Sequence, residues 1–206
     1  MKTYLAACAA LTLAAALPAH ANLLIDGGFE QTVIGFGGYA TVNSTPAWTG
    51  APNIEVQNHV AGSPYEGNQF VELDTNANSS MYQDFTTIAG TTYQIHFQYS
   101  PRPGVSALSN GIELLWDNSL YAMVALSGIG LADTVWTGYD LTALASGPTS
   151  RIQFNAFGPS DGLGGYLDNV SVSAVPEPGT LQIFGLGLVI LATVAGTRRR
   201  APSMSF

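Results

Sequence analysis

Apolar and polar residues alternate along much of this chain. The clearest case is YQIHFQY at 93–99, where every second residue is aromatic or aliphatic and the residues between are polar. Side chains of a strand point alternately to its two faces, so this pattern predicts a half-buried strand. Shorter alternations occur at 53–57, 69–74, 80–86, 111–116, 151–157 and 166–173, with Gly, Pro, Asn and Ser between them.

These strands define the predicted fold class. Residues 22–174 have the length of one domain with a sizeable core, and no segment among them shows a helical period. Short strands separated by turn residues predict an all-β domain, a single antiparallel β-sandwich or jelly roll.

The first 21 residues have the pattern of a signal peptide. Lys2 supplies the positive charge, residues 5–17 are almost wholly apolar but too few to span a membrane, and Ala19-His20-Ala21 has the small-x-small form of a cleavage site. We predict export, with cleavage between Ala21 and Asn22.

The C-terminal region has the features of a membrane anchor. Residues 181–197 carry no charge, and as a helix they would reach roughly 26 Å, close to the thickness of a hydrocarbon core. The three arginines at 198–200 would stay cytoplasmic, which places the domain outside. We predict one transmembrane helix at 181–197, a basic segment at 198–200 and a short tail at 201–206.

Residues 175–200 as a whole resemble a sorting signal. Pro176-Glu177-Pro178, the apolar segment and the arginines follow in the order of the PEP-CTERM signal of Gram-negative bacteria. The resemblance implies an exported protein of an exopolysaccharide-producing bacterium, held in the inner membrane by its C-terminal helix. An exosortase-type protease would then process it for the cell surface or the extracellular matrix. The alternative is an ordinary single-pass anchor after a proline-rich linker.

The charge and cysteine content of the domain exclude some classes of partner and chemistry. Between 22 and 175, two arginines oppose thirteen Asp and Glu, a net charge of −11. Such a surface repels phosphate backbones and anionic headgroups, so we expect no nucleic-acid partner. The single cysteine, Cys8, lies in the signal peptide, which excludes disulfides and thiol catalysis from the domain. Either the core is sufficient alone, or bound metal supplements it.

Two further motifs resemble those of galactose-binding-like jelly rolls, a group that includes many carbohydrate-binding modules. NLLIDGGFE at 22–30 is similar to their opening segment, and GYLDNVSV at 165–172 is similar to their closing strand. EGNQFVELD at 66–74 and GTTY at 90–93 are similar to one branch of this fold. The resemblance implies the same sandwich fold and a sugar-binding role.

Asp168 and Glu30 are candidate metal ligands. If Val170 and Val172 face the core, alternation puts Asp168 on the same face, where a carboxylate needs a partner. In calcium-binding members of the group, the residues matching Glu30 and Asp168 help to bind a structural Ca²⁺ together with backbone carbonyls. The alternative is that Asp168 caps a turn at a solvated strand end.

Glu72 and Asp74 are two residues apart, so they share one face of a strand. We expect this face to be solvent-exposed, opposite Val71 and Leu73. A glycan-cleaving enzyme would instead need two carboxyls at a set separation across a cleft. No motif of histidine, serine or phosphate-binding chemistry accompanies them.

Three residues in turn-rich segments are candidate ligand contacts. The rings of Trp48 and Tyr65 could stack on sugars, although Trp48, like Trp116 and Trp136, could equally fill the core. Arg102 either binds a uronic acid or balances a nearby carboxylate. The sequence thus predicts an exported, non-catalytic protein that associates with exopolysaccharide or cell-envelope glycans. The alternatives are a structural matrix protein without a sugar site, or a glycan-cleaving enzyme.

Overall fold

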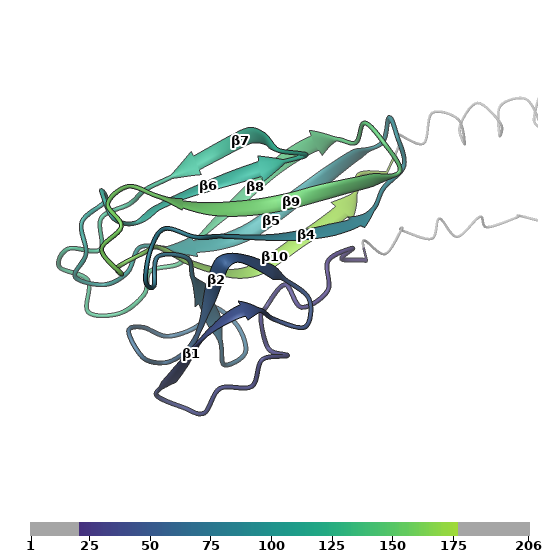
Figure 1. Ribbon diagram of the computed structural model, residues 1–206. Helices are drawn as coiled ribbons and strands as arrows, with labels where there is room; N and C mark the ends of the chain where they lie inside the picture. The colour runs from purple at the N-terminus through teal and green to yellow at the C-terminus, as the bar shows by residue number, and fades with distance from the viewer. Residues whose placement is uncertain (1–20, 177–206) are drawn as a thin grey trace, which may run out of the picture.

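All regular structure described for this chain is β-strand. The computed structural model describes residues 21–176, and no helix occurs among them (Figure 1). Ten strands lie in this range: β1 Gly38–Ser44, β2 Thr49–Asn58, β3 Phe70–Glu72, β4 Ser80–Thr86, β5 Thr92–Ser100, β6 Gly111–Trp116, β7 Ser119–Val124, β8 Thr137–Leu144, β9 Thr149–Phe157 and β10 Tyr166–Ala174.

The predicted segments at the two ends lie outside this range. They are residues 1–20 of the signal peptide, Glu177 and Pro178 of the sorting motif, the helix at 181–197, the basic segment at 198–200 and the tail at 201–206. Within 21–176 no helix is long and apolar enough to cross a membrane.

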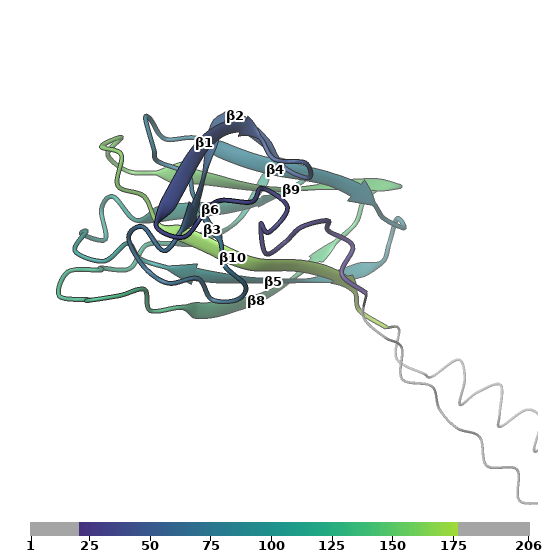
Figure 2. The same ribbon diagram turned by 90° about the horizontal axis from the view of Figure 1, so that it is seen from below.

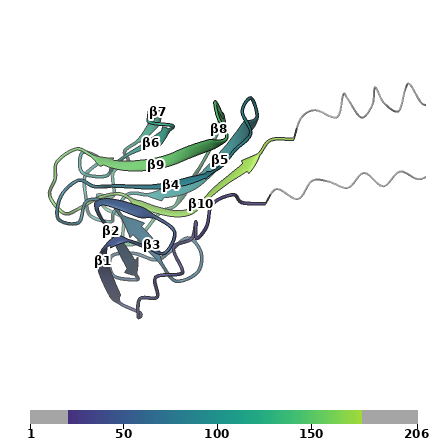
Figure 3. The same cartoon turned by 45° about the vertical axis from the view of Figure 1, so that its right-hand side comes forward.

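The strands form an antiparallel sandwich of two layers. The pairing order is β7-β6-β9-β4-β2-β3-β10-β5-β8, with β1 added to β2. The long strand β2 joins the layers, because its first part pairs with β4 and its second part with β3. Figure 2 shows β4, β9 and β6 on one side and β10, β5 and β8 on the other, and Figure 3 shows β1 outside β2. This arrangement confirms the predicted all-β sandwich.

Aromatic rings fill the space between the layers. Phe97 of β5 lies 5.3 Å, centroid to centroid, from Phe154 of β9, and Tyr93 of β5 lies 6.1 Å from Trp116 of β6. These strand pairs are not neighbours in the sheet order, so the contacts join opposite faces. The inward residues of β5 are those that the alternation at 93–99 assigns to the core.

Candidate functional site

Backbone pairing brings polar side chains from four strands onto one outer face. Thr41 of β1 pairs with Glu55 of β2, and Glu55 also pairs with Glu72 of β3. Glu72 pairs in turn with Tyr166 of β10. Side chains of directly opposed residues share a face, so these residues form one row across the sheet. An adjacent row holds Tyr39, Gln57 and Phe70.

An ion pair fixes the centre of this row. The Glu72 side chain is 0% exposed, and Nη1 of Arg102 lies 2.7 Å from its Oε2. The backbone N–H of Gly164 donates to Oε1 of Glu72 at 2.6 Å. Nε2 of Gln57 donates to Oε2 of Glu72 at 2.7 Å and to Oε1 of Glu55 at 2.8 Å. One amide therefore links the two carboxylates and holds them in place.

A groove of about 310 Å³ lies beside this network. Glu55, Gln57 and Arg102 line it with polar groups, and the Glu55 carboxylate also accepts a hydrogen bond from the Thr75 hydroxyl. Tyr39 of β1 lines the same groove with a side chain that is 61% exposed. An accessible aromatic ring beside fixed polar groups is an arrangement suited to binding a small polar ligand.

Burial changes the protonation of the central carboxyl. It raises the pKa of Glu72 from its ordinary value of 4.5 to about 8, more than the opposing effects of Arg102 and the Gly164 N–H lower it. Burial also raises the pKa of Asp168, to about 7. At a pH between the ordinary pKa and the raised pKa of each group, the folded chain keeps a proton that the unfolded chain has released.

The stability of the domain is therefore expected to fall as pH rises from 5 to 8. The contribution of Glu72 is present in full below its unfolded-state pKa and decreases up to the folded-state value, by up to about 1.4 kcal/mol per pH unit. Urea denaturation at pH 5, 6.5 and 8 measures this slope. Glu72→Gln is expected to reduce the slope to the part that Asp168 contributes; an unchanged slope in this variant would contradict the assignment to Glu72.

Arg102 and Tyr65 occupy different places relative to the groove. Arg102 lines the groove, and its guanidinium balances Glu72. The Tyr65 side chain is exposed, but its ring makes an edge contact with Trp136, at 6.4 Å between centroids, and it does not line the groove.

Trp48 lies in the core, which corrects the prediction that it contacts a ligand. Its side chain is 1% exposed, with ring centroids 5.7 Å from Phe29 and 6.4 Å from Phe154. Its Nε1 donates to the backbone oxygen of Asp26 at 3.0 Å. The turn residues before Trp48 indicated a surface loop, whereas the ring itself points inward.

Glu72 and Asp74 are both fully buried, so the predicted solvent-exposed face is wrong. The alternation itself is correct, because Val71 belongs to the core cluster and Glu72 points to the other side. Neighbouring strands and loops cover that other side. The carboxylate of Asp74 accepts a hydrogen bond from the backbone N–H of Asp161 at 3.1 Å.

Asp168 is buried, but it does not share a face with Val170. The pairing of β10 with β5 shifts register between Asp168 and Ser171, and Asn169 has a φ of 46°. This bulge reverses the alternation, because an extra residue moves every later side chain to the opposite face. Leu167 and Val170 therefore both face the core.

Asp168 and Glu30 bind the backbone of one loop, residues 65–69. Oδ2 of Asp168 accepts the N–H groups of Tyr65 at 2.8 Å and Glu66 at 3.1 Å. Oε1 of Glu30 accepts the N–H groups of Asn68 and Gln69, at 2.7 and 2.8 Å. The two carboxylates therefore hold the loop from both of its ends.

The backbone N–H groups around Asp168 and Glu30 do not fit the predicted calcium site. Ca²⁺ is bound by six to eight oxygens, whereas the 65–69 loop turns N–H groups toward both carboxylates. Within residues 21–176, no group of three or more His, Cys, Asp and Glu side chains is placed to hold a metal ion.

The sequence patterns did not indicate Tyr39, Thr41, Glu55, Gln57 or Thr75. Glu55 and Gln57 are polar positions of the alternation at 53–57, and the other three residues lie outside the alternating segments. The register of β1, β2 and β3 brings the first four together, and Thr75 joins them through hydrogen bonds to Thr41 and Glu55; register is not visible in any one segment.

The C-terminal segment matches a known sorting motif. Residues 174–200 match the family model of the PEP-CTERM protein-sorting motif. This chain carries a PEP-CTERM sorting motif. The PEP-CTERM match confirms the predicted sorting signal, including Pro176, Glu177 and Pro178, and implies an exported protein that is sorted at the cell envelope.

The folded domain also has relatives of known sequence and structure. This chain is 33% identical over 156 residues, 72% of its length, to a multifunctional-autoprocessing repeats-in-toxin of Vibrio cholerae serotype O1. The chain spans about 3% of the length of the curated relatives it matches.

Among solved structures, a carbohydrate-binding module in complex with β-1,4-galactotriose has a TM-score of 0.54 and 15% identity, covering 75% of this chain and 99% of that one. A family 16 carbohydrate-binding module has a TM-score of 0.50 and 15% identity, covering 73% and 99%. The described domain thus has the β-sandwich fold of carbohydrate-binding modules.

Proposed function

We propose that this domain is a non-catalytic glycan-binding domain and that the groove beside Tyr39 is its binding site. The observation that supports this most is the combination of one accessible ring with polar groups already fixed by hydrogen bonds. Sugars present flat C–H faces to aromatic rings and hydroxyls to polar groups, and a preorganised site loses little free energy in ordering itself. The likeness in fold to carbohydrate-binding modules is consistent with this role.

The sorting motif supports an exported protein at the cell envelope, where glycans are available as ligands. We propose that the protein associates with exopolysaccharide or cell-envelope glycans. In this scheme the segment 181–197 anchors it in the inner membrane of a Gram-negative cell, and an exosortase-type protease then processes the motif for transfer to the surface or matrix. The sorting motif supports this sequence of events.

The carboxylates support binding rather than cleavage. Both oxygens of Glu72 already accept hydrogen bonds from Arg102, Gln57 or Gly164, and the side chain is buried. A glycosidase needs two carboxyls that reach the scissile bond from opposite sides. Glu72 therefore acts in this proposal as a structural group beneath the groove.

Affinity electrophoresis of the purified protein tests the proposal. Gels would contain soluble β-1,4-galactan, xylan, β-glucan or the exopolysaccharide of the producing cells. We expect at least one glycan to retard the protein. Tyr39→Ala should weaken retention about tenfold, the value of one lost stacking contact, while Tyr39→Phe should preserve it.

Ile88→Ala is the matched control, because Ile88 is exposed and lies in the turn between β4 and β5. Retention unchanged in Tyr39→Ala would reject the groove as the site. A folded protein that no glycan retards would favour the structural matrix protein instead.

A further inference from the structure

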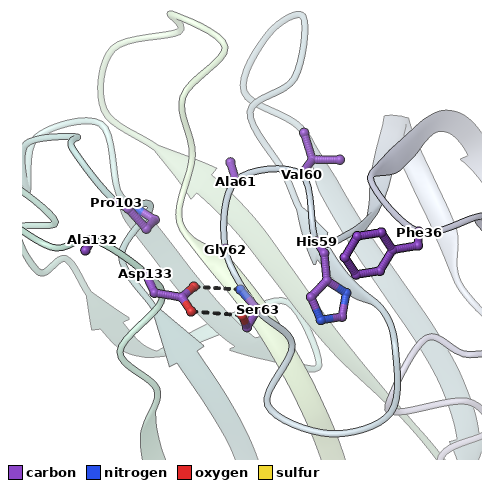
Figure 4. Close-up of a pocket in the computed structure, with 9 residues that line it drawn as sticks. All are labelled: Phe36, His59, Val60, Ala61, Gly62, Ser63, Pro103, Ala132 and Asp133. Atoms are coloured by element: carbon purple, nitrogen blue, oxygen red, sulfur yellow. Dashed lines mark hydrogen bonds between the residues drawn. The ribbon is translucent and has the colours of Figure 1, made fainter.

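A second hollow adjoins the groove. It has a volume of about 450 Å³ and is formed by residues 59–63 together with Phe36, Pro103 and the segment 132–133 (Figure 4). Val60 lines both hollows, and Arg102 of the groove is followed directly by Pro103 of the second hollow. The two spaces are therefore neighbours on one surface.

The second hollow has an apolar side. The Phe36 side chain is 84% exposed, and its ring lies 4.9 Å from the His59 ring, centroid to centroid, with 31° between the planes. Nδ1 of His59 lies 2.7 Å from Oδ1 of Asn58, a contact that orients the imidazole ring. Phe36 also lines a third hollow, of about 370 Å³. A single accessible ring thus separates two neighbouring hollows.

The opposite side of the second hollow is polar. Figure 4 shows Asp133 across the hollow from Phe36 and His59. The Asp133 carboxylate is hydrogen-bonded to Ser63. The carboxylate accepts the backbone N–H of Ser63 at 2.8 Å and its hydroxyl at 2.9 Å. The Ser63 hydroxyl lowers the pKa of Asp133, so the group is an ionised acceptor at neutral pH. An apolar ring facing a fixed acceptor suits one sugar ring with its hydroxyls.

Charge restricts which sugars can bind. Asp133 in the second hollow and Glu55 in the groove are carboxylates, and the one guanidinium that lines either hollow, that of Arg102, is paired with Glu72. The domain around them has a net charge of −11, from two arginines against thirteen Asp and Glu. Uronate or sulfate groups would meet like charges, while Nη1 of the one guanidinium in the lining is already hydrogen-bonded to Glu72.

We infer that the hollow beside Phe36 is a further sugar subsite, continuous with the groove, so that the ligand is an uncharged chain of several sugars rather than one terminal sugar. This inference rests on the proposed function of the groove. In this inference Phe36 contacts only the longer sugar chains, whereas Tyr39 contacts sugar chains of every length.

Titration calorimetry with β-1,4-linked galactose, glucose and xylose oligomers of about two, four and six residues tests the inference. For the oligomer series that binds, affinity is expected to rise about tenfold from the shortest to the longest chain, equivalent to one added stacking contact. Phe36→Ala should abolish this gain and leave the affinity for the shortest chain unchanged. Tyr39→Ala should weaken binding at all lengths, and Ile88→Ala should change nothing.

Each other outcome has a distinct meaning. Equal affinity at all lengths, or a Phe36→Ala variant that keeps the full gain, overturns the subsite while the groove remains the binding site. Tighter binding of galacturonate oligomers than of galactose oligomers overturns the assignment to uncharged chains. Binding of no oligomer at any length overturns the groove and the subsite together. Because Phe36 is so exposed, its substitution should not disturb folding, and an unchanged melting temperature checks this.

Discussion

Trp48→Ala is expected to lower the free energy of unfolding by about 3–5 kcal/mol, because it removes a large, fully buried ring from the core. The ring contacts Phe29 of the opening segment and Phe154 of β9, so its loss leaves a cavity between them. The backbone oxygen of Asp26 also loses the indole N–H as its donor. Urea denaturation of the variant at fixed pH measures the effect.

Trp48→Phe separates packing from the hydrogen bond, since it fills most of the space but provides no N–H. We expect a smaller loss in this variant, and full glycan retention in both variants under conditions where they are folded. A stable Trp48→Ala protein that has lost retention would instead restore Trp48 as a ligand contact.

Asp168→Ala is expected to cost about 3 kcal/mol, because it removes a buried side-chain acceptor that three backbone N–H groups share. Those of Tyr65, Glu66 and Asn169 all donate to this carboxylate. Tyr65 and Glu66 belong to the loop that follows residues 59–63 of the second hollow, so local order there should decrease as well. Asp168→Asn keeps one acceptor oxygen and should cost less.

Calcium distinguishes the two roles considered for Asp168. If it acts as an acceptor for backbone N–H groups, millimolar Ca²⁺ and chelator should give the same melting temperature. A rise of several degrees with Ca²⁺ that is absent in Asp168→Asn would re-establish the metal site predicted from the sequence.

Local alternation was sufficient to predict the central strands. The ranges 80–86 and 111–116 coincide with β4 and β6, and 93–99 lies within β5. Strands β1, β7 and β8 were not predicted. β7 lies at one end of the sheet and exposes Leu120, Tyr121 and Met123, so its apolar residues do not alternate with polar ones. In β8, Tyr139, Leu141 and Ala143 face the core and alternate with Gly138, Asp140 and Thr142, but only Ala143 of the three is fully buried.

The site was less predictable than the fold, for a physical reason. The sorting motif is continuous in sequence and was therefore recognisable at 175–200. The groove combines side chains from separate strands and loops, and a bulge of one residue at Asn169 was enough to reverse the face assigned to Asp168. Arg102 was a candidate because of its rarity, but its partner Glu72 was assigned to solvent.

The strand β1 carries the wall of the groove, yet among the described strands its backbone pairs only with β2. Its residues Tyr39 and Thr41 point away from the layers that provide most of the stability. Mutations at these positions can therefore alter recognition while the folding energy stays almost constant. Selection, in nature or in a display library, can diversify this short strand on an unchanged scaffold, as happens with the variable loops of an antibody.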